Sequence, residues 1–89
     1  MNKILIVDDE RQIIQQVRAL LSYFGYSSDF VSRTELMFPK LERDRFDLIL
    51  LDVYMPGTDG LSLLKQLKTH PIWRNSIKPA IRKNDAHCY

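Results

Sequence analysis

The sequence predicts an α/β protein built on a parallel sheet. Short apolar segments alternate with longer segments of helical periodicity, and two of the most apolar segments end in aspartates. Strands that alternate with helices usually pair in parallel, through right-handed crossovers. A chain of 89 residues is expected to form one domain at most.

The first strand and helix follow directly from the N-terminal pattern. Residues 3–7 are apolar on both faces, which is typical of a central strand in a parallel sheet. Asp9-Glu10-Arg11-Gln12 resembles a capping box, and Gly25 is a typical helix stop. Apolar residues at helical spacing between them form the expected buried face: Ile13, Ile14, Val17, Leu20, Leu21 and Phe24.

The second unit has weaker signals. Residues 26–31 carry polar insertions that suit an edge strand. Ser32-Arg33-Thr34-Glu35 is a second capping-box pattern. Pro39 cannot donate to the carbonyl of Glu35, so a short or kinked helix that ends near Arg43 is expected.

Residues 46–51 are predicted to form the third and most apolar strand. Asp59 is expected to cap a third helix, which ends near His70 because Pro71 follows. The apolar face of that helix contains Leu61, Leu64 and Leu67, with Leu63 at its margin. The pattern weakens after this point, although residues 76–81 could begin a fourth strand.

Composition and charge exclude several classes of protein. Residues 1–70 carry nine Lys and Arg against ten Asp and Glu, whereas residues 71–89 carry four against one. The excess positive charge therefore lies in the C-terminal tail, which is expected to be solvated, and no nucleic-acid surface is expected. The apolar runs are too short for a membrane span or a signal peptide. Cys88 is the single cysteine, which suits a reducing cytoplasm.

Three aspartates are the candidate functional residues. Asp8 and Asp9 follow the first strand, and Asp52 follows the third. Because neighbouring parallel strands end at the same edge, these carboxylates are expected to converge, and they would repel one another unless a cation lay among them. Carboxylates suit Mg²⁺. Asp9 and Asp52 are the predicted direct ligands, Asp8 binds through a water, and the turn adds the backbone carbonyl of Tyr54.

A partly exposed, metal-bound Asp52 could also act as a nucleophile and accept a phosphoryl group. Taken singly, each motif has an ordinary explanation: Asp8-Asp9 and Asp59 as helix caps, and Met55-Pro56-Gly57 as a turn. The combination and order of the motifs favour the metal site.

These motifs together resemble the receiver domain of two-component response regulators. The matching segments are residues 4–10, 46–52 and 55–60, and the likeness covers about residues 2–72. It implies a flavodoxin-like (CheY-like) parallel sheet with helices on both faces and strand order 2-1-3-4-5. It also implies a phosphorelay in which a histidine kinase or phosphotransfer protein phosphorylates Asp52, while Asp8 and Asp9 hold Mg²⁺.

The chain also departs from the family pattern. A whole receiver ends strand 4 with Thr or Ser and strand 5 with Lys, but here Arg82 and Lys83 stand where strand 4 should continue. Lys78-Pro79 lies only 26 residues past Asp52, too close for the Lys-Pro pair after strand 5. Residues 1–81 are therefore interpreted as a partial receiver domain, incomplete within strand 4, and residues 82–89 as a basic tail outside the family.

An incomplete strand 4 has two expected consequences. The edge of strand 3 would be open, which predicts weak stability and self-association through that edge. Phosphorylation of Asp52 would be impaired by the missing Thr or Ser and Lys.

The same residues are compatible with two other functions. A non-catalytic kinase-docking or dimerising fragment is one alternative. A Mg²⁺-dependent aspartyl phosphatase is another, although such enzymes usually carry Asp-x-Asp and here the acids are adjacent. A zinc site from His70, His87 and Cys88 is not expected, because their spacing matches no zinc motif. The preferred reading is a phospho-acceptor and not an enzyme.

Overall fold

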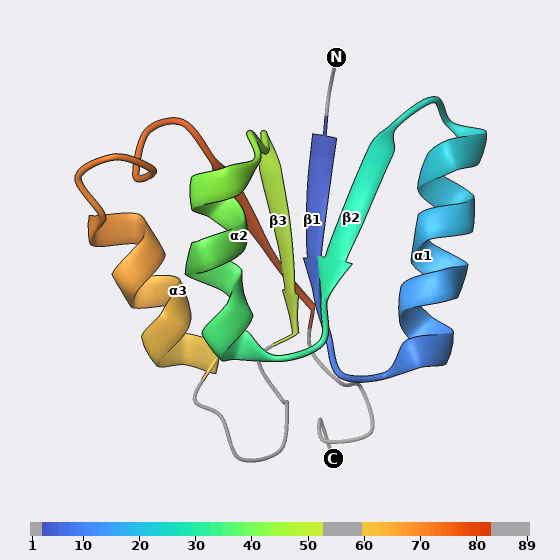
Figure 1. Cartoon of the computed structure of the whole chain (residues 1–89), viewed down its shortest axis with the longest axis horizontal. Coiled ribbons are helices and arrows are strands. Elements are labelled where there is room, and N and C mark those ends of the chain that lie inside the picture. Colours follow the sequence, from blue (N-terminus) through green and yellow to red (C-terminus); the bar gives the residue numbers. More distant parts are fainter. Residues whose placement is uncertain (1–2, 53–59, 83–89) are drawn as a thin grey trace.

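The computed structural model describes residues 3–52 and 60–82. Within these residues the chain forms one parallel sheet of four strands in the order β2-β1-β3-β4 (Figure 1). This confirms the predicted α/β class and places the second strand at an edge. The strands are β1 (Lys3–Val7), β2 (Ser27–Val31), β3 (Leu48–Asp52) and β4 (Lys78–Arg82).

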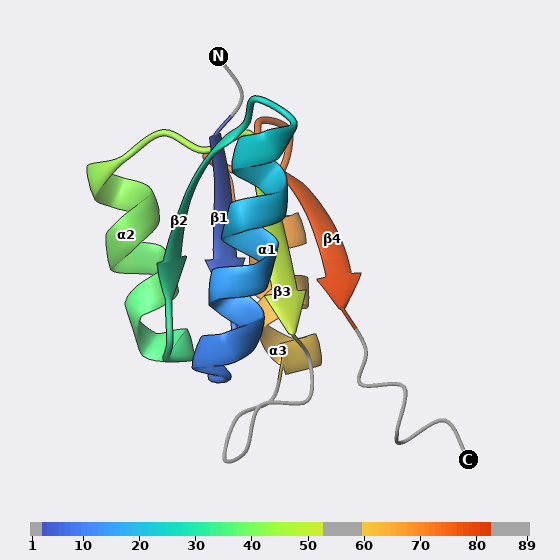
Figure 2. The same ribbon diagram turned by 90° about the vertical axis from the view of Figure 1, so that its right-hand side faces the viewer.

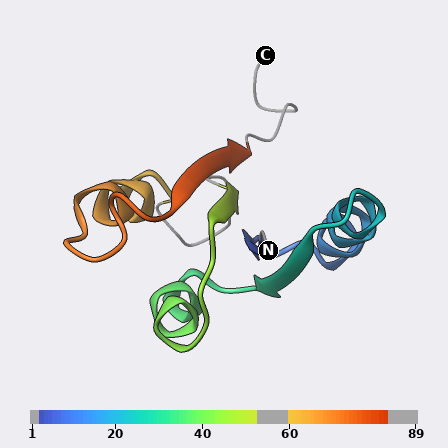
Figure 3. The same ribbon diagram turned by 90° about the horizontal axis from the view of Figure 1, so that it is seen from above.

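Helices cover both faces of the sheet, but unequally. Seen from above, α2 and α3 lie on one face, and α1 lies on the other beside β2 (Figure 3). The helices are α1 (Arg11–Tyr23), α2 (Met37–Arg43) and α3 (Gly60–Thr69), and a 3₁₀ turn, η1 (Thr34–Leu36), precedes α2. No helix in the described ranges is long and apolar enough to cross a membrane.

The main core lies between the sheet and the pair α2 and α3. Alternate residues of β1 and β3 point into it, so that Leu5, Val7, Ile49 and Leu51 have no exposed side-chain surface. The helices add Met37, Leu41, Leu64 and Leu67, and the flanking segments add Val31, Phe46, Trp73 and Ile77.

Trp73 is a part of this core that the sequence analysis did not predict. It lies between α3 and β4 and stacks against Phe38 and His70, with ring centroids 5.7 and 4.1 Å away. His70 is therefore a packed residue at the end of α3, and its Nδ1 accepts a hydrogen bond from the Ile72 N–H at 3.1 Å.

Both predicted capping boxes are wrong. The N-cap of α1 is Glu10, not Asp9, and it makes no side-chain cap bond. The Glu10 N–H donates instead to Asp8 Oδ1 at 3.0 Å. At the second pattern, Arg33 precedes η1, again without a side-chain cap bond. The stop after α1 is confirmed, because Gly25 adopts φ of 87°, a conformation that glycine tolerates best.

The two later helices follow the predictions with local shifts. Pro39 is the third residue of α2, where its missing N–H breaks no helical bond, and α2 ends at Arg43 as predicted. In α3, Leu64 and Leu67 are buried, but Leu61 is 62% exposed and Leu63 packs against the core in its place. The predicted cap Asp59 lies outside the described residues.

The fourth strand corrects one expectation. β4 pairs with β3 along its whole length, from Leu48 opposite Lys78 to Asp52 opposite Arg82. The edge of strand 3, which was expected to be open, is therefore covered, and β4 becomes the edge strand (Figure 2). Lys78 and Pro79 lie within β4, as expected if they are not the Lys-Pro pair that follows a fifth strand.

Candidate metal centre

The three predicted aspartates converge at the carboxyl edge of the sheet. Asp8 and Asp9 directly follow β1, and Asp52 is the last residue of β3. Val7 and Leu51 are register partners, so the residues after them are neighbours in space. One carboxylate oxygen from each aspartate lies within 4.8 Å of the others. The predicted meeting of these side chains is thus confirmed.

The carboxylates differ in exposure. Asp8 is 1% exposed and Asp52 is 4% exposed, whereas Asp9 faces solvent. Two unit charges at about 5 Å repel by roughly 3 kcal/mol at an effective dielectric constant of about 20. Closely spaced carboxylates, two of them buried, therefore favour a cation among them.

Hydrogen bonds fix Asp8 at the junction of three elements. Its N–H donates to the Val31 carbonyl at 3.2 Å, which extends the β1–β2 pairing by one residue. Its Oδ1 accepts from the Glu10 N–H at 3.0 Å, just before α1 begins. The backbone of Asp8 is therefore tied to β2, and its carboxylate is held by the Glu10 N–H, which limits its freedom at the site.

The donor set fits a hard cation. This group contains only carboxylates, with no His or Cys, and hard oxygen donors suit Mg²⁺ better than zinc. Tyr54, the predicted carbonyl ligand, lies outside the described residues, as do the turn residues 55–57. His87 and Cys88 also lie outside them, and His70 lies in the aromatic stack next to Trp73.

A second charged cluster, which the sequence analysis missed, joins α2 to β2. Lys40 Nζ lies 2.6 Å from Asp29 Oδ2 and 3.3 Å from Asp44 Oδ2. Burial acts to raise the pKa of Asp29, but the hydrogen bond from Lys40, a bond from the Phe30 N–H and the charges of Lys40 and Arg18 together lower it. The hydrogen bond to Asp29 is the main cause that raises the pKa of Lys40.

Comparison with known proteins agrees with this geometry. Residues 4–81 match the family model described as the response regulator receiver domain. The chain is 39% identical over 67 residues to the response regulator MprA of Mycobacterium leprae, which covers 75% of this chain. It is also 39% identical over 66 residues to the transcriptional regulatory protein ResD of Bacillus subtilis, which covers 74% of this chain.

Solved structures give the same result. The response regulator TrrA from Thermotoga maritima, in complex with Mg²⁺-BeF, superposes with a TM-score of 0.82 at 29% identity and covers 93% of this chain. The chemotaxis protein CheY4 of Vibrio cholerae superposes with a TM-score of 0.78 at 30% identity and covers 89% of it. The chain spans 70% and 67% of these structures. It spans only 29% of MprA and 28% of ResD.

Proposed function

This chain belongs to the response regulator receiver family, and we propose that its Asp52 accepts a phosphoryl group from a sensor histidine kinase or phosphotransfer protein. The observation that carries the proposal is the convergence of Asp8, Asp9 and Asp52 at one edge of the sheet. Family membership supports the same role, because the acids occupy the strand ends at which the family pattern has its acid pair and its phospho-acceptor.

The proposed reaction is a direct transfer between side chains. A carboxylate oxygen of Asp52 attacks the phosphorus of a phosphohistidine. As the new O–P bond forms, the P–N bond breaks and its electron pair returns to the imidazole. The product is an acyl phosphate on Asp52. With acetyl phosphate as donor, acetate leaves instead.

Asp9 and Asp52 are the proposed direct ligands of Mg²⁺, with Asp8 acting through a water and the carbonyl of Tyr54 completing the protein ligands. The bound ion would supply positive charge to the phosphoryl oxygens. Asp8, fixed by backbone hydrogen bonds, would keep its charge in place beside the ion. A magnesium-loaded relative, TrrA, supports this choice of ion.

Phosphorylation of this chain is expected to be slow. Arg82 is the register partner of Asp52, at the strand end where the family pattern has Thr or Ser. Losing one charge-stabilising group typically costs about 10²–10³-fold in rate. The proposed boundaries are a partial receiver at 1–81 and a basic tail outside the family at 82–89.

We further propose that the chain acts as a phospho-acceptor alone. Asp52 is a stoichiometric acceptor, so the protein is not an enzyme with turnover of its own. It works in the cytoplasm, where its phosphoryl donors present their phosphohistidines, and it contacts neither nucleic acid nor membrane. Docking to the kinase without phosphoryl transfer is the alternative role.

Incubation with Mg²⁺ and acetyl phosphate, followed by intact-mass measurement, tests the proposal. We expect slow addition of one phosphoryl group, none after chelation of Mg²⁺ and none in Asp52→Asn. Asp47→Asn is the matched control, because Asp47 lies just before the opposite end of β3 and is exposed.

Other outcomes would lead elsewhere. Equal incorporation in Asp52→Asn would refute the assignment of the acceptor. Kinase binding with no incorporation at any time would favour the docking role, and steady hydrolysis of p-nitrophenyl phosphate would indicate an aspartyl phosphatase.

A further inference from the structure

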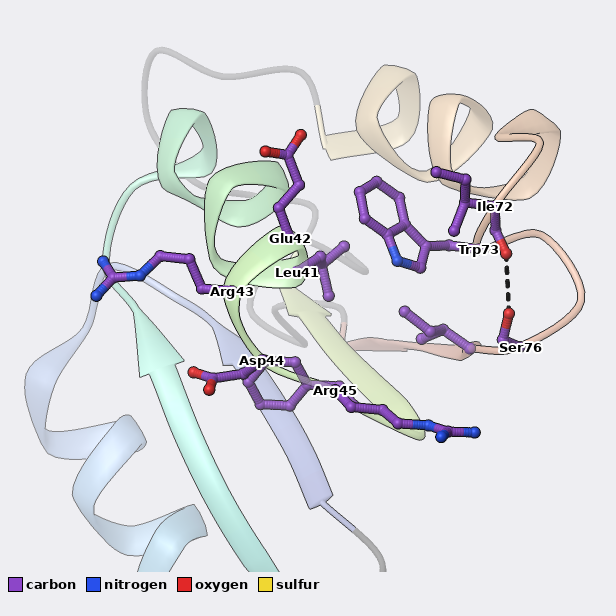
Figure 4. Close-up of a pocket in the computed structure, with 10 residues that line it drawn as sticks. Leu41, Glu42, Arg43, Asp44, Arg45, Ile72, Trp73 and Ser76 are labelled. Carbon is purple, nitrogen blue, oxygen red and sulfur yellow. Dashed lines mark hydrogen bonds between the residues drawn. The ribbon is translucent and has the colours of Figure 1, made fainter.

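A pocket of about 430 Å³ lies far from the acid cluster, at the amino ends of β3 and β4 (Figure 4). It opens between the C-terminal end of α2 and the turn that follows α3. We propose that this pocket binds a small monocarboxylate with an aromatic or branched aliphatic body. The proposal is independent of the phosphoryl chemistry at Asp52.

The inner wall of the pocket is apolar. Leu41, Phe46, Trp73 and Ile77 line it, and each of them is at most 9% exposed. These side chains come from α2, from the segment before β3 and from the turn before β4, so the wall is part of the packed core. An apolar ligand body would therefore meet a preformed surface.

Trp73 provides a hydrogen-bond donor that the protein does not use. Its side chain is about nine-tenths buried, yet its indole N–H has no hydrogen-bond partner among the described residues. No side-chain nitrogen or oxygen in the described ranges is both sealed from solvent and unpartnered. The indole N–H is therefore still accessible, and Figure 4 shows the nitrogen on the pocket side of the ring, across from Leu41. An indole N–H only donates, so it selects an acceptor on the ligand.

The charges at the mouth favour an anion. Arg45 extends along the mouth toward Ser76, whereas the side chains of Arg43 and Asp44, which also line the pocket, project to the opposite side (Figure 4). Arg45 has no ion pair within the described part of the chain, and Asp44 is already engaged by Lys40 and Lys3. Ser76 Oγ donates to the Ile72 carbonyl at 2.9 Å, so its proton is in use. Glu42 also lines the pocket, but its carboxylate points away on the α2 side.

These features define the ligand class. Its carboxylate would pair with Arg45 and accept from the Trp73 N–H, and its apolar body would cover Leu41 and Ile77. The volume is in the lower part of the range for small-molecule sites. For a ligand the size of benzoate, the expected dissociation constant is about 1 mM.

A titration with benzoate, followed by ¹H–¹⁵N NMR, tests the site. The chain has one tryptophan, so the indole N–H gives a single, assigned resonance. We expect this resonance to shift saturably with benzoate and to respond at least about tenfold more weakly to benzyl alcohol, which lacks the charge. Arg45→Ala should weaken benzoate binding about tenfold. Lys68→Ala, which removes a positive charge from the exposed side of α3 outside the pocket, should leave it within about twofold.

Three results would overturn the proposal. These are a shift that stays linear in benzoate, equal affinities for benzoate and benzyl alcohol, and equal effects of Arg45→Ala and Lys68→Ala. Trp73→Phe offers a second test, because it keeps an aromatic ring but removes the donor. Ligand-observed ¹⁹F NMR with 4-fluorobenzoate should then show weaker binding, and unchanged binding would exclude the indole N–H from the site.

Discussion

At the scale of single residues, Asp9 differs from the two acids beside it. Asp8 and Asp52 are buried and belong to the ends of strands, whereas Asp9 is exposed and precedes α1. Asp9 can therefore be neutralised with little effect on packing. Its carboxylate still lies within 4.8 Å of its partners, so its charge contributes to their repulsion.

Asp9→Asn is predicted to have opposite effects with and without a divalent ion. In EDTA the variant should unfold at a slightly higher temperature than the parent chain, because one like charge is gone. In excess Mg²⁺ the variant should instead unfold at a lower temperature than the parent chain. A bound ion stabilises the folded state by RT ln(1 + [Mg²⁺]/Kd), and the variant binds the ion less well, so the parent chain is stabilised more. Thermal melts in the two buffers measure both differences.

Glu10→Gln is the matched control for this prediction. It removes the adjacent exposed charge, which lies outside the acid cluster, and should leave the Mg²⁺-dependent shift unchanged. The same Mg²⁺ response in Asp9→Asn as in the parent chain would show that Asp9 is not a ligand.

At the scale of elements, one lysine ties α2 to the edge strand β2. Lys40 bridges Asp29 of β2 and Asp44 at the end of its own helix. α2 is only seven residues long, so its stability depends on such tertiary contacts. The pairs are partly exposed, and each is therefore expected to contribute about 0.2–1 kcal/mol.

The pair should stabilise the fold over a defined pH range. The pKa of Asp29 lies below the ordinary value of 3.8, so its contribution is present above about pH 4 and is lost as the pH falls through the folded pKa. The pKa of Lys40 lies above 10.5, so its contribution is present below that pH and is lost as the pH rises through the folded pKa.

Urea unfolding of Lys40→Met tests this range. At neutral pH the free energy of unfolding should be lower for the variant than for the parent chain. As the pH falls through the folded pKa of Asp29, that free energy should decrease less in the variant than in the parent chain. Lys65→Met, on the exposed side of α3, serves as control. If Lys40→Met and the parent chain lose the same free energy of unfolding at acid pH, Lys40 is not the source of the stabilisation that depends on ionised Asp29.

The positions of the strand ends could be predicted from the sequence, whereas contacts between elements could not. The meeting of Asp8 and Asp9 with Asp52 was predictable, because it depends only on which strand each acid follows. The capping box predicted at the start of α1 failed because the carboxylate of Asp8 accepts from the Glu10 N–H, which no local pattern shows. Trp73 lies in a turn where apolar residues follow neither helical nor strand spacing. Its burial depends on contacts with Phe38 and the C-terminal end of α3, which the local sequence does not show. The Asp29–Lys40 pair depends on how α2 crosses β2, which the sequence does not encode locally.

At the scale of the whole molecule, both outer edges of the sheet are poor templates for another strand. Backbone groups of successive strand residues point to alternate sides. The Lys78 N–H donates toward β3, so Pro79 faces outward, where it has no N–H to offer. On β2, the outward N–H of Phe30 donates to Asp29 Oδ1 at 2.8 Å, and the Ser28 carbonyl accepts from Arg18 at 3.1 Å. Self-association through an edge stays a prediction, and these groups should weaken it.

Pro79→Val is therefore predicted to promote self-association. Valine restores the missing N–H and favours the extended backbone, so the outer edge of β4 can pair with a second chain. Sedimentation velocity at rising concentration should show a larger oligomeric fraction than for the parent chain. Pro71→Ala, in the exposed turn after α3, is the control and should sediment like the parent. Identical sedimentation of Pro79→Val and the parent would argue against the β4 edge as an interface.

The pyrrolidine ring at position 79 also constrains any fifth strand that extends this sheet in the family order. Along the outer rim of β4, the described backbone offers the carbonyls of Pro79 and Ile81 but only one amide, that of Ile81. A strand laid there would make an incomplete ladder with a gap at the proline. Its alignment would then depend on Ile81, two residues further along and close to Asp52, so the most firmly attached part of such a strand would be the part nearest the acid cluster.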